Sequence, residues 1–206
     1  LGYGVLESYG FHMLETLQCM VERRQGGETG VRRVLALQGE RAWQAQQQGR
    51  WSGELFKAAA EANGQVVKED KLRASLMHDN ASVYLLDYRD SVKMSAVMAV
   101  NLGAQFCLAL KLKEKDEPFV SWFQLEDKKP FGHFAFLVQA IEEMVHTGHP
   151  SYPVERTLLT TGILDRAMHS LAAEGVAYRT PELAIRYKAV EWPYANQAGG
   201  NPYPCQ

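Results

Sequence analysis

Two neighbouring stretches, Val92–Val100 (VKMSAVMAV) and Gln105–Leu112 (QFCLALKL), decide the fold class of this chain. In both, larger apolar residues alternate one by one with smaller or more polar residues. This period of two is typical of strands in an antiparallel sheet. Strand-like segments flank the pair, at Val83–Arg89 before it and at Phe119–Leu125 after it. The sequence therefore predicts a meander of four antiparallel strands.

Helices are predicted on both sides of this meander. Residues 8–24 repeat apolar side chains at steps of three and four, with Ser8 as the expected N-cap, and residues 55–62 form a shorter helix. Two further helices are expected after the strands, beginning near Pro130 and near Pro153. Strands grouped together, with helices before and after them, predict an α+β fold rather than a doubly wound α/β fold.

The remaining segments carry weaker patterns. Val31–Leu37 is a short strand candidate, residues 40–53 are polar and glutamine-rich, and residues 66–80 are expected to be an irregular surface connection. We expect residues 1–190 to form one domain. Residues 191–206 are rich in Gly, Pro and Asn and are expected to be a tail that need not be ordered.

One face of the predicted sheet carries small residues. They are Ser95, Val97, Ala99, Cys107 and Ala109. A face open to water usually carries longer polar side chains. We therefore expect something flat to cover this face, and another sheet is the natural candidate. The alternative is that the chain's own loops cover this face.

Composition and charge exclude several classes of protein. The chain has 206 residues, of which 46% are hydrophobic, and its formal net charge is −2. These values suit one globular domain and give no electrostatic reason to expect nucleic acid or a membrane surface as a partner. No apolar run approaches the ~20 residues of a membrane-spanning helix. The distant cysteines Cys19, Cys107 and Cys205 favour a reducing compartment, and hence the cytoplasm.

Two common kinds of site are not predicted. The sequence has no G-x-G-x-x-G or Walker-type loop, so it offers no usual device for holding the phosphates of a nucleotide. Glu142, His146 and His149 fall at helical spacing, but the helix is expected to end at Gly148, which spoils the geometry of a metal site. No metal-binding residue is therefore predicted.

His12 is the residue with the strongest claim to chemistry. It lies in the first helix, on the side opposite Leu14 and Leu17, and a histidine is suited to accept a proton from a hydroxyl group near neutral pH. Gly10 lowers helix propensity by about 1 kcal/mol relative to Ala, which suggests that something packs close to the backbone there. Taken alone, His12 is better explained as a structural residue.

The order of the motifs resembles a known family. Gly2–Gly4 leads into a helix that starts with the Gly-x-His pattern of residues 10–12, and the strands are followed by residues 148–170 (GHPSYPVERTLLTTGILDRAMHS). Over nearly all of residues 1–190, this arrangement resembles the C-terminal half of the glucose–fructose oxidoreductase and inositol dehydrogenase (Gfo/Idh/MocA) superfamily.

The resemblance implies a fold, an activity and site residues. Members of this family pair an N-terminal Rossmann domain, which holds NAD or NADP, with a C-terminal α+β domain. That domain is an open, largely antiparallel sheet with helices on one face, and its other face often packs against a second subunit, which implies a homodimer through the small-residue face. They transfer a hydride between the cofactor and a sugar or cyclitol alcohol. The family's catalytic His corresponds to His12, the candidate proton acceptor. The family often has an Asp four residues earlier, where this chain has Ser8, so Glu7 is the candidate for its support.

Three interpretations of function remain open, of which the last is a structural or interaction protein that merely keeps the α+β scaffold. In the first, the chain is the substrate and oligomerisation domain of such an oxidoreductase, is a fragment that lacks the Rossmann domain, and is not catalytically competent alone. In the second, it is a degenerate or stand-alone family member that serves as a non-catalytic binding or dimerisation module. The retained Gly10-x-His12 pattern favours the first reading, and Ser8 favours the second.

Overall fold

The computed structural model describes residues 1–102, 105–126 and 128–191. The tail predicted from residue 191 onward lies outside these ranges, apart from its first residue. In chain order, the elements are α1 Leu6–Val21, β1 Val31–Leu37, α2 Gly39–Gln47, α3 Gly53–Ala62, α4 Glu69–Leu76, β2 Ser82–Tyr88, β3 Lys93–Met98, β4 Phe106–Leu110, β5 Phe119–Phe123, α5 His133–Thr147, α6 Val154–Ala172, β6 Tyr178–Arg179 and the 3-10 turn η1 Pro181–Leu183.

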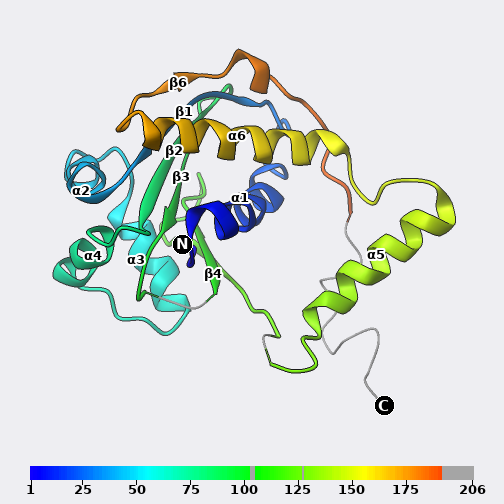
Figure 1. Cartoon of the computed structure of the whole chain (residues 1–206), viewed down its shortest axis with the longest axis horizontal. Coiled ribbons are helices and arrows are strands. Elements are labelled where there is room, and N and C mark those ends of the chain that lie inside the picture. Colours follow the sequence, from blue (N-terminus) through cyan, green and yellow to red (C-terminus); the bar gives the residue numbers. More distant parts are fainter. Residues whose placement is uncertain (103–104, 127, 192–206) are drawn as a thin grey trace.

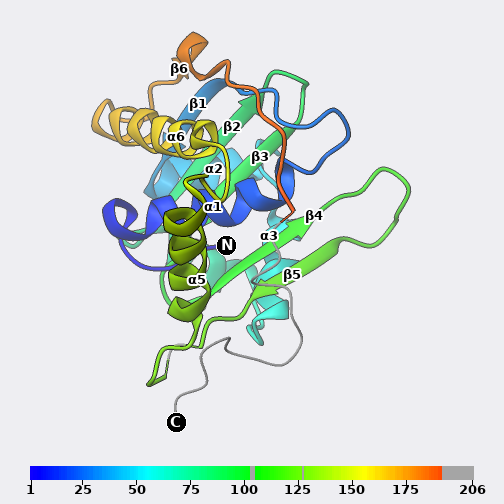
Figure 2. The same cartoon turned by 90° about the vertical axis from the view of Figure 1, so that its right-hand side faces the viewer.

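The strands form two antiparallel sheets, which confirms the predicted α+β class. One sheet has the order β3-β2-β1-β6, and the other consists of β4 and β5. Figure 2 shows the second pair lying beside the larger sheet. The prediction of one four-stranded meander is wrong at a single place, because β3 and β4 follow each other in sequence but do not pair.

The first two residues of the chain lie between β3 and β4. The amide of Gly2 donates to the carbonyl of Val97 at 2.8 Å, and the amide of Ala99 donates to the carbonyl of Gly2 at 3.0 Å. On the other side, Leu1 and Cys107 exchange two backbone hydrogen bonds, of 2.8 and 3.0 Å. These contacts join the two sheets. They also explain why β3 and β4, whose alternating sequences predicted a hairpin, do not pair with each other.

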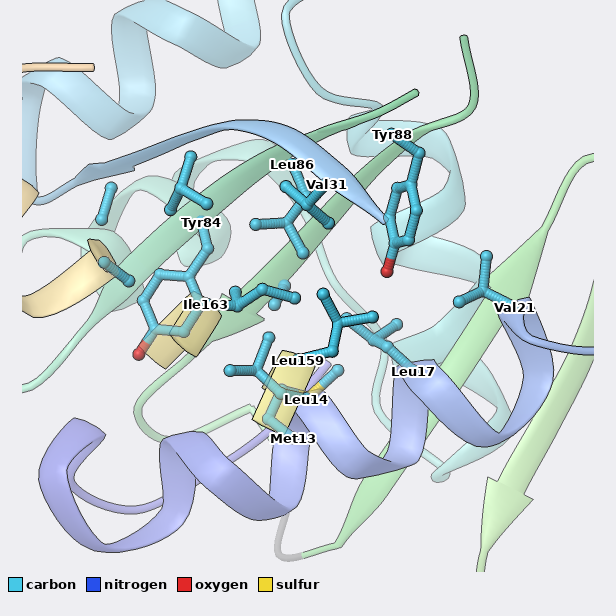
Figure 3. Packing of buried hydrophobic residues seen from close by; sticks show 14 of the residues in the cluster. Met13, Leu14, Leu17, Val21, Val31, Tyr84, Leu86, Tyr88, Leu159 and Ile163 are labelled. Atoms are coloured by element: carbon cyan, nitrogen blue, oxygen red, sulfur yellow. The ribbon is translucent and has the colours of Figure 1, made fainter. Parts of the chain in front are cut away.

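Both faces of the larger sheet are buried. On one face α1 and α6 pack against the sheet (Figure 1), and the side chains of Leu14, Tyr84 and Leu159 meet there (Figure 3). On the other face α2, α3 and α4 cover a second cluster, which includes Leu35, Val83 and Trp51. Because strand side chains alternate between faces, neighbouring residues of one strand contribute to different clusters.

The small-residue face is therefore covered by the chain itself. Val97, Ala99 and Cys107 are buried in the second cluster together with Phe56 of α3. The expectation that this face is free for a homodimer is wrong, and so is the expectation that helices pack on one face alone. The small side chains allow helices to approach the sheet closely. The chain's own segments cover the face, as the alternative held, but they are helices rather than loops.

Two of these covering helices were missed in the sequence. α2 begins at Gly39 and runs into the polar residues 40–53, and α4 lies within residues 66–80, which were expected to be irregular. Each presents a short apolar stripe to the sheet: Ala42 and Ala45 in α2, and Leu72 and Leu76 in α4. Such short stripes give weak periodicity. The signal that could have found α2 is its content of Glu, Arg, Ala and Gln, which all favour helices.

Helix α1 begins earlier than predicted. Its N-cap is Val5, whose side chain makes no capping hydrogen bond, and Ser8 lies inside the first turns instead of capping the helix. The entry to the helix is fixed by Leu1 and Gly2, which are held between the sheets. Tertiary contacts therefore replace a local capping signal at this end.

The loop between α1 and β1 is held by a buried carboxylate. Glu28, which is 2% exposed, accepts hydrogen bonds from the amides of Thr29 (2.8 Å) and Gly30 (2.6 Å) and from the side chain of Gln18 (2.6 Å). Gly30 has φ +84°, and a Cβ there would lie 2.3 Å from the carbonyl oxygen of Leu183. Only glycine fits this position without displacing backbone.

We expect the substitution Gly30→Ala to lower the free energy of unfolding by about 3 kcal/mol or more, because it adds left-handed backbone strain to a clash with backbone atoms. Gly49→Ala is the matched control. Gly49 has φ +68°, but nothing lies within 4 Å of an added Cβ, so about 1–2 kcal/mol is expected. Urea unfolding measures both values, and equal losses would contradict the assigned close approach.

Candidate functional site

His12 lies on the exposed face of α1, as predicted. The opposite face of the helix is buried through Met13, Leu14 and Leu17. Around the imidazole, the ring centroids of Tyr9 and Phe106 lie at 5.9 and 6.4 Å. No hydrogen bond to the imidazole is present within the described ranges. His12 is therefore an exposed base that aromatic rings flank on the α1 and β4 sides.

The close approach predicted at Gly10 is confirmed. Gly10 is buried, and a Cβ at this position would lie 3.1 Å from the hydroxyl oxygen of Tyr84 and 3.1 Å from a methyl carbon of Leu164. The glycine lets β2 and α6 pack against the backbone of α1. Two residues later, His12 points to solvent. The Gly-x-His pattern thus combines a packing position with an exposed position on one helix.

Glu7 and His12 are not brought together. Both are exposed, and they are five residues apart, which separates their directions by about 140° around the helix. No hydrogen bond or ion pair joins them in the part of the chain that the structure describes. Glu15 lies one turn after His12 on the same side of α1. Helical spacing could have indicated this carboxylate.

Glu15 belongs to a partly buried polar group between α1 and α6. The hydroxyl of Thr160 donates to its carboxylate at 2.7 Å, and Arg156 forms ion pairs with Glu15 at 3.0 Å and with Glu22 at 3.5 Å. Burial raises the pKa of Glu15 above its usual value, although Arg156 and Thr160 act in the opposite direction. The group holds a carboxylate next to His12 in a partly dehydrated setting.

A second polar group is buried at the end of α1. Gln18 donates to Glu28 and to Tyr187 at 2.6 Å each, and accepts from the hydroxyl of Tyr88 at 3.1 Å. The hydroxyl of Tyr187 donates to Glu22 at 2.7 Å. These bonds tie the segment after η1 to α1 and β2. Because every residue of this group finds a partner within it, we interpret it as structural.

The other reactive groups give no site. Burial raises the pKa of the Cys19 thiol to about 11, which keeps it protonated and unreactive, and burial also raises the pKa of Cys107. Cys205 lies outside the described residues. Among residues 1–102, 105–126 and 128–191, no group of three or more His, Cys, Asp or Glu side chains could hold a metal ion.

Comparison of this chain with known proteins identifies no similar protein. No family model, no curated protein and no solved structure matches this chain. Across the described residues, no helix is both long and apolar enough to cross a membrane. The functional interpretation therefore depends on the residues themselves.

We expect the substitution Arg156→Gln to move the titration midpoint of Glu15 to higher pH, because it removes the cation that stabilises the carboxylate. Carboxyl ¹³C NMR titration measures the midpoint. The substitution Asp165→Asn, on an exposed part of α6, is the control and should leave it unchanged. An unmoved midpoint in Arg156→Gln would show that the ion pair does not act in solution.

The sign of the linked stability effect follows from the raised pKa. A carboxyl group whose pKa is higher in the folded state than in the unfolded chain favours folding when protonated, so its contribution is lost as the pH rises through the folded pKa. The substitution Glu15→Gln removes this titrating group. As the pH rises through the weakly acidic range, the free energy of unfolding should therefore fall less in the variant than in the parent chain.

Proposed function

We propose that this chain is the substrate and oligomerisation domain of a cytoplasmic NAD(P)-dependent oxidoreductase that acts on a sugar or cyclitol alcohol. The observation that carries the proposal is the placement of Gly10 and His12. The glycine lies against the core, while the histidine is exposed beside aromatic rings. A base that accepts a proton from a bound substrate must be accessible in this way. The α+β architecture is consistent with the family that the sequence resembles.

In this proposal His12 accepts the proton of the substrate hydroxyl as the carbon–hydrogen bond breaks. The imidazole nitrogen takes the proton, and the hydride leaves with its electron pair. Tyr9, which is 38% exposed, offers an apolar edge against which the ring of a sugar or cyclitol can lie, and the buried ring of Phe106 lies behind the imidazole. Glu15 stabilises the imidazolium that forms, because its carboxylate lies one turn away on the same side of α1.

The described residues provide no phosphate-binding loop, and the backbone between α1 and β1 is already occupied by the carboxylate of Glu28. These observations support a site for NAD or NADP outside this chain. A separate Rossmann domain would hold the cofactor, which supplies the hydride acceptor when bound. The isolated chain is expected to be inactive.

The test uses the protein in which this chain is joined to a cofactor-binding domain. The substitution His12→Ala should lower kcat/KM for the alcohol by a factor on the order of 10² or more, because a general base is lost. His146→Ala, at an exposed histidine of α5, is the control and should change it by less than about twofold. Wild-type turnover in His12→Ala would end the proposed role.

A second function, a dimerisation module, is favoured by helix α5. This helix projects away from the two sheets (Figures 1 and 2), and of its residues Ala140 alone is buried. Six of its apolar side chains are 41–72% exposed; they are Phe134, Leu137, Val138, Ile141, Met144 and Val145. The described residues leave this stripe uncovered.

The occupant of the α5 stripe in this second proposal is a second copy of the chain. Phe134, Val138, Ile141 and Val145 follow the alternating steps of four and three that let two helices pair along a seam. Together, the exposed side chains present roughly 600 Å² per copy. Two copies would bury about 1,200 Å², which is at the lower limit of specific interfaces.

We expect the chain to sediment as a dimer at a concentration of about 100 μM and the substitution Ile141→Glu to convert it to a monomer, because a buried unpaired carboxylate is costly. Gln139→Glu adds the same charge to the same helix away from the seam and should leave the dimer intact. Sedimentation velocity measures both variants. A monomeric parent chain would refute this second proposal.

A further inference from the structure

An open-sided cavity of about 380 Å³ lies between β3 and β4, next to Leu1. Lys93–Ser95 of β3 line one side, and Leu108–Lys111, at the end of β4, line the other. Within the described residues, β3 pairs with β2 along its far edge and β4 pairs with β5 along its far edge. The two edges that face the cavity are joined at one end by Leu1 and Gly2 and are otherwise unpaired.

Backbone groups on both edges point into this cavity. The carbonyl of Val97 faces the gap, because it accepts from Gly2, and both backbone groups of Cys107 face it through their bonds to Leu1. Successive residues of a strand present their N–H and C=O groups to alternate edges. The backbone groups of Ser95, two residues before Val97, and of Ala109, two residues after Cys107, therefore face the same gap. Strand edges that are left unpaired inside a fold are costly.

The walls above and below the gap are apolar. Leu17 and Val21 of α1 lie on one side, and Trp51 and Phe56 lie on the other. The charged side chains of Lys93 and Lys111 lie at the mouth, where both residues are exposed. A strand buried on both faces is apolar at successive positions instead of alternating.

We propose that this cavity is a slot for one extended apolar strand of about four residues, joined to the nitrogen of Leu1. Its direction follows from the existing contacts: Gly2 forms a parallel bridge with Met98, and Leu1 exchanges paired bonds with Cys107 as in an antiparallel ladder. Beside Lys93–Val97, a strand rises roughly 3.3 Å per residue and fills the gap.

The added strand joins both sheets into one, in the order β5, β4, added strand, β3, β2, β1, β6. The nitrogen of Leu1 already lies in line with the slot, so a preceding residue enters it without any rearrangement of the sheets. Only the source of the strand rests on the proposed function, in which the polypeptide from the cofactor-binding domain would supply it. The pairing itself does not depend on any chemistry at His12.

The test extends the chain before Leu1 by Thr-Val-Ile-Val in one variant and by Gly-Ser-Gly-Ser in a control. We expect the apolar extension to raise the thermal midpoint by on the order of 5 °C relative to the parent chain, and the control to leave it unchanged. Hydrogen exchange of the amides of Ser95 and Ala109 should slow by about 10²-fold or more in the apolar variant alone. Equal midpoints and equal exchange in both variants would overturn the proposal.

A third arm separates a joined strand from a docked one. The parent chain is mixed with 1 mM acetyl-Thr-Val-Ile-Val-amide, which cannot be joined to Leu1, and no protection of the Ala109 amide is expected. Full protection by the free peptide would overturn the assignment to a joined strand, because the slot would then take a segment of a separate polypeptide. Activity of His12 variants is measured independently, so a failed oxidoreductase proposal and a failed strand slot are distinguishable.

Discussion

Four backbone hydrogen bonds at Leu1 and Gly2 hold the two sheets of this protein together. They place β4 and β5 beside the larger sheet and fix the point from which α1 leaves. Both clusters of buried side chains depend on this arrangement, because each includes residues of β3 and of β4. The empty slot beside Leu1 is a consequence of the same geometry, since the bridge covers only one end of the facing edges.

Helix α1 connects packing to the candidate chemistry. Its inner side carries Gly10, which allows Tyr84 to approach, and the end of the helix carries the polar side chains that bind the segment after η1. Its outer side presents His12 next to Glu15. A rigid helix that is fixed at both ends is a suitable support for a base, because a catalytic group must be held in one geometry.

The two proposed functions use different surfaces. The oxidoreductase proposal uses the outer side of α1 and the rings beside it, whereas the dimerisation proposal uses the exposed stripe of α5. They are compatible in one protein, since enzymes often combine a catalytic surface with a separate interface between copies. The sheet face, which the sequence first suggested as the interface, is occupied by α2, α3 and α4.

Much of the fold was predictable from local patterns. The period of two in residues 92–100 and 105–112 determined the strands, and apolar residues at steps of three and four determined α1, α3, α5 and α6. The sequence also determined that Gly10 needs close packing and that His12 lies on the outer side of its helix. These features depend on residues near one another in the chain, so their physical cause can be read locally.

Only the tertiary structure decided the rest. It separated β3 from β4 by inserting Leu1 and Gly2, placed α2 and α4 over the small-residue face, and joined Glu15 to Arg156 and Thr160 of α6. It also left the stripe of α5 uncovered by the described part of the chain. Each of these outcomes depends on which distant segment pairs with a strand edge or covers a face of the sheet. Burial of apolar surface and backbone pairing between segments far apart in the chain determine that choice.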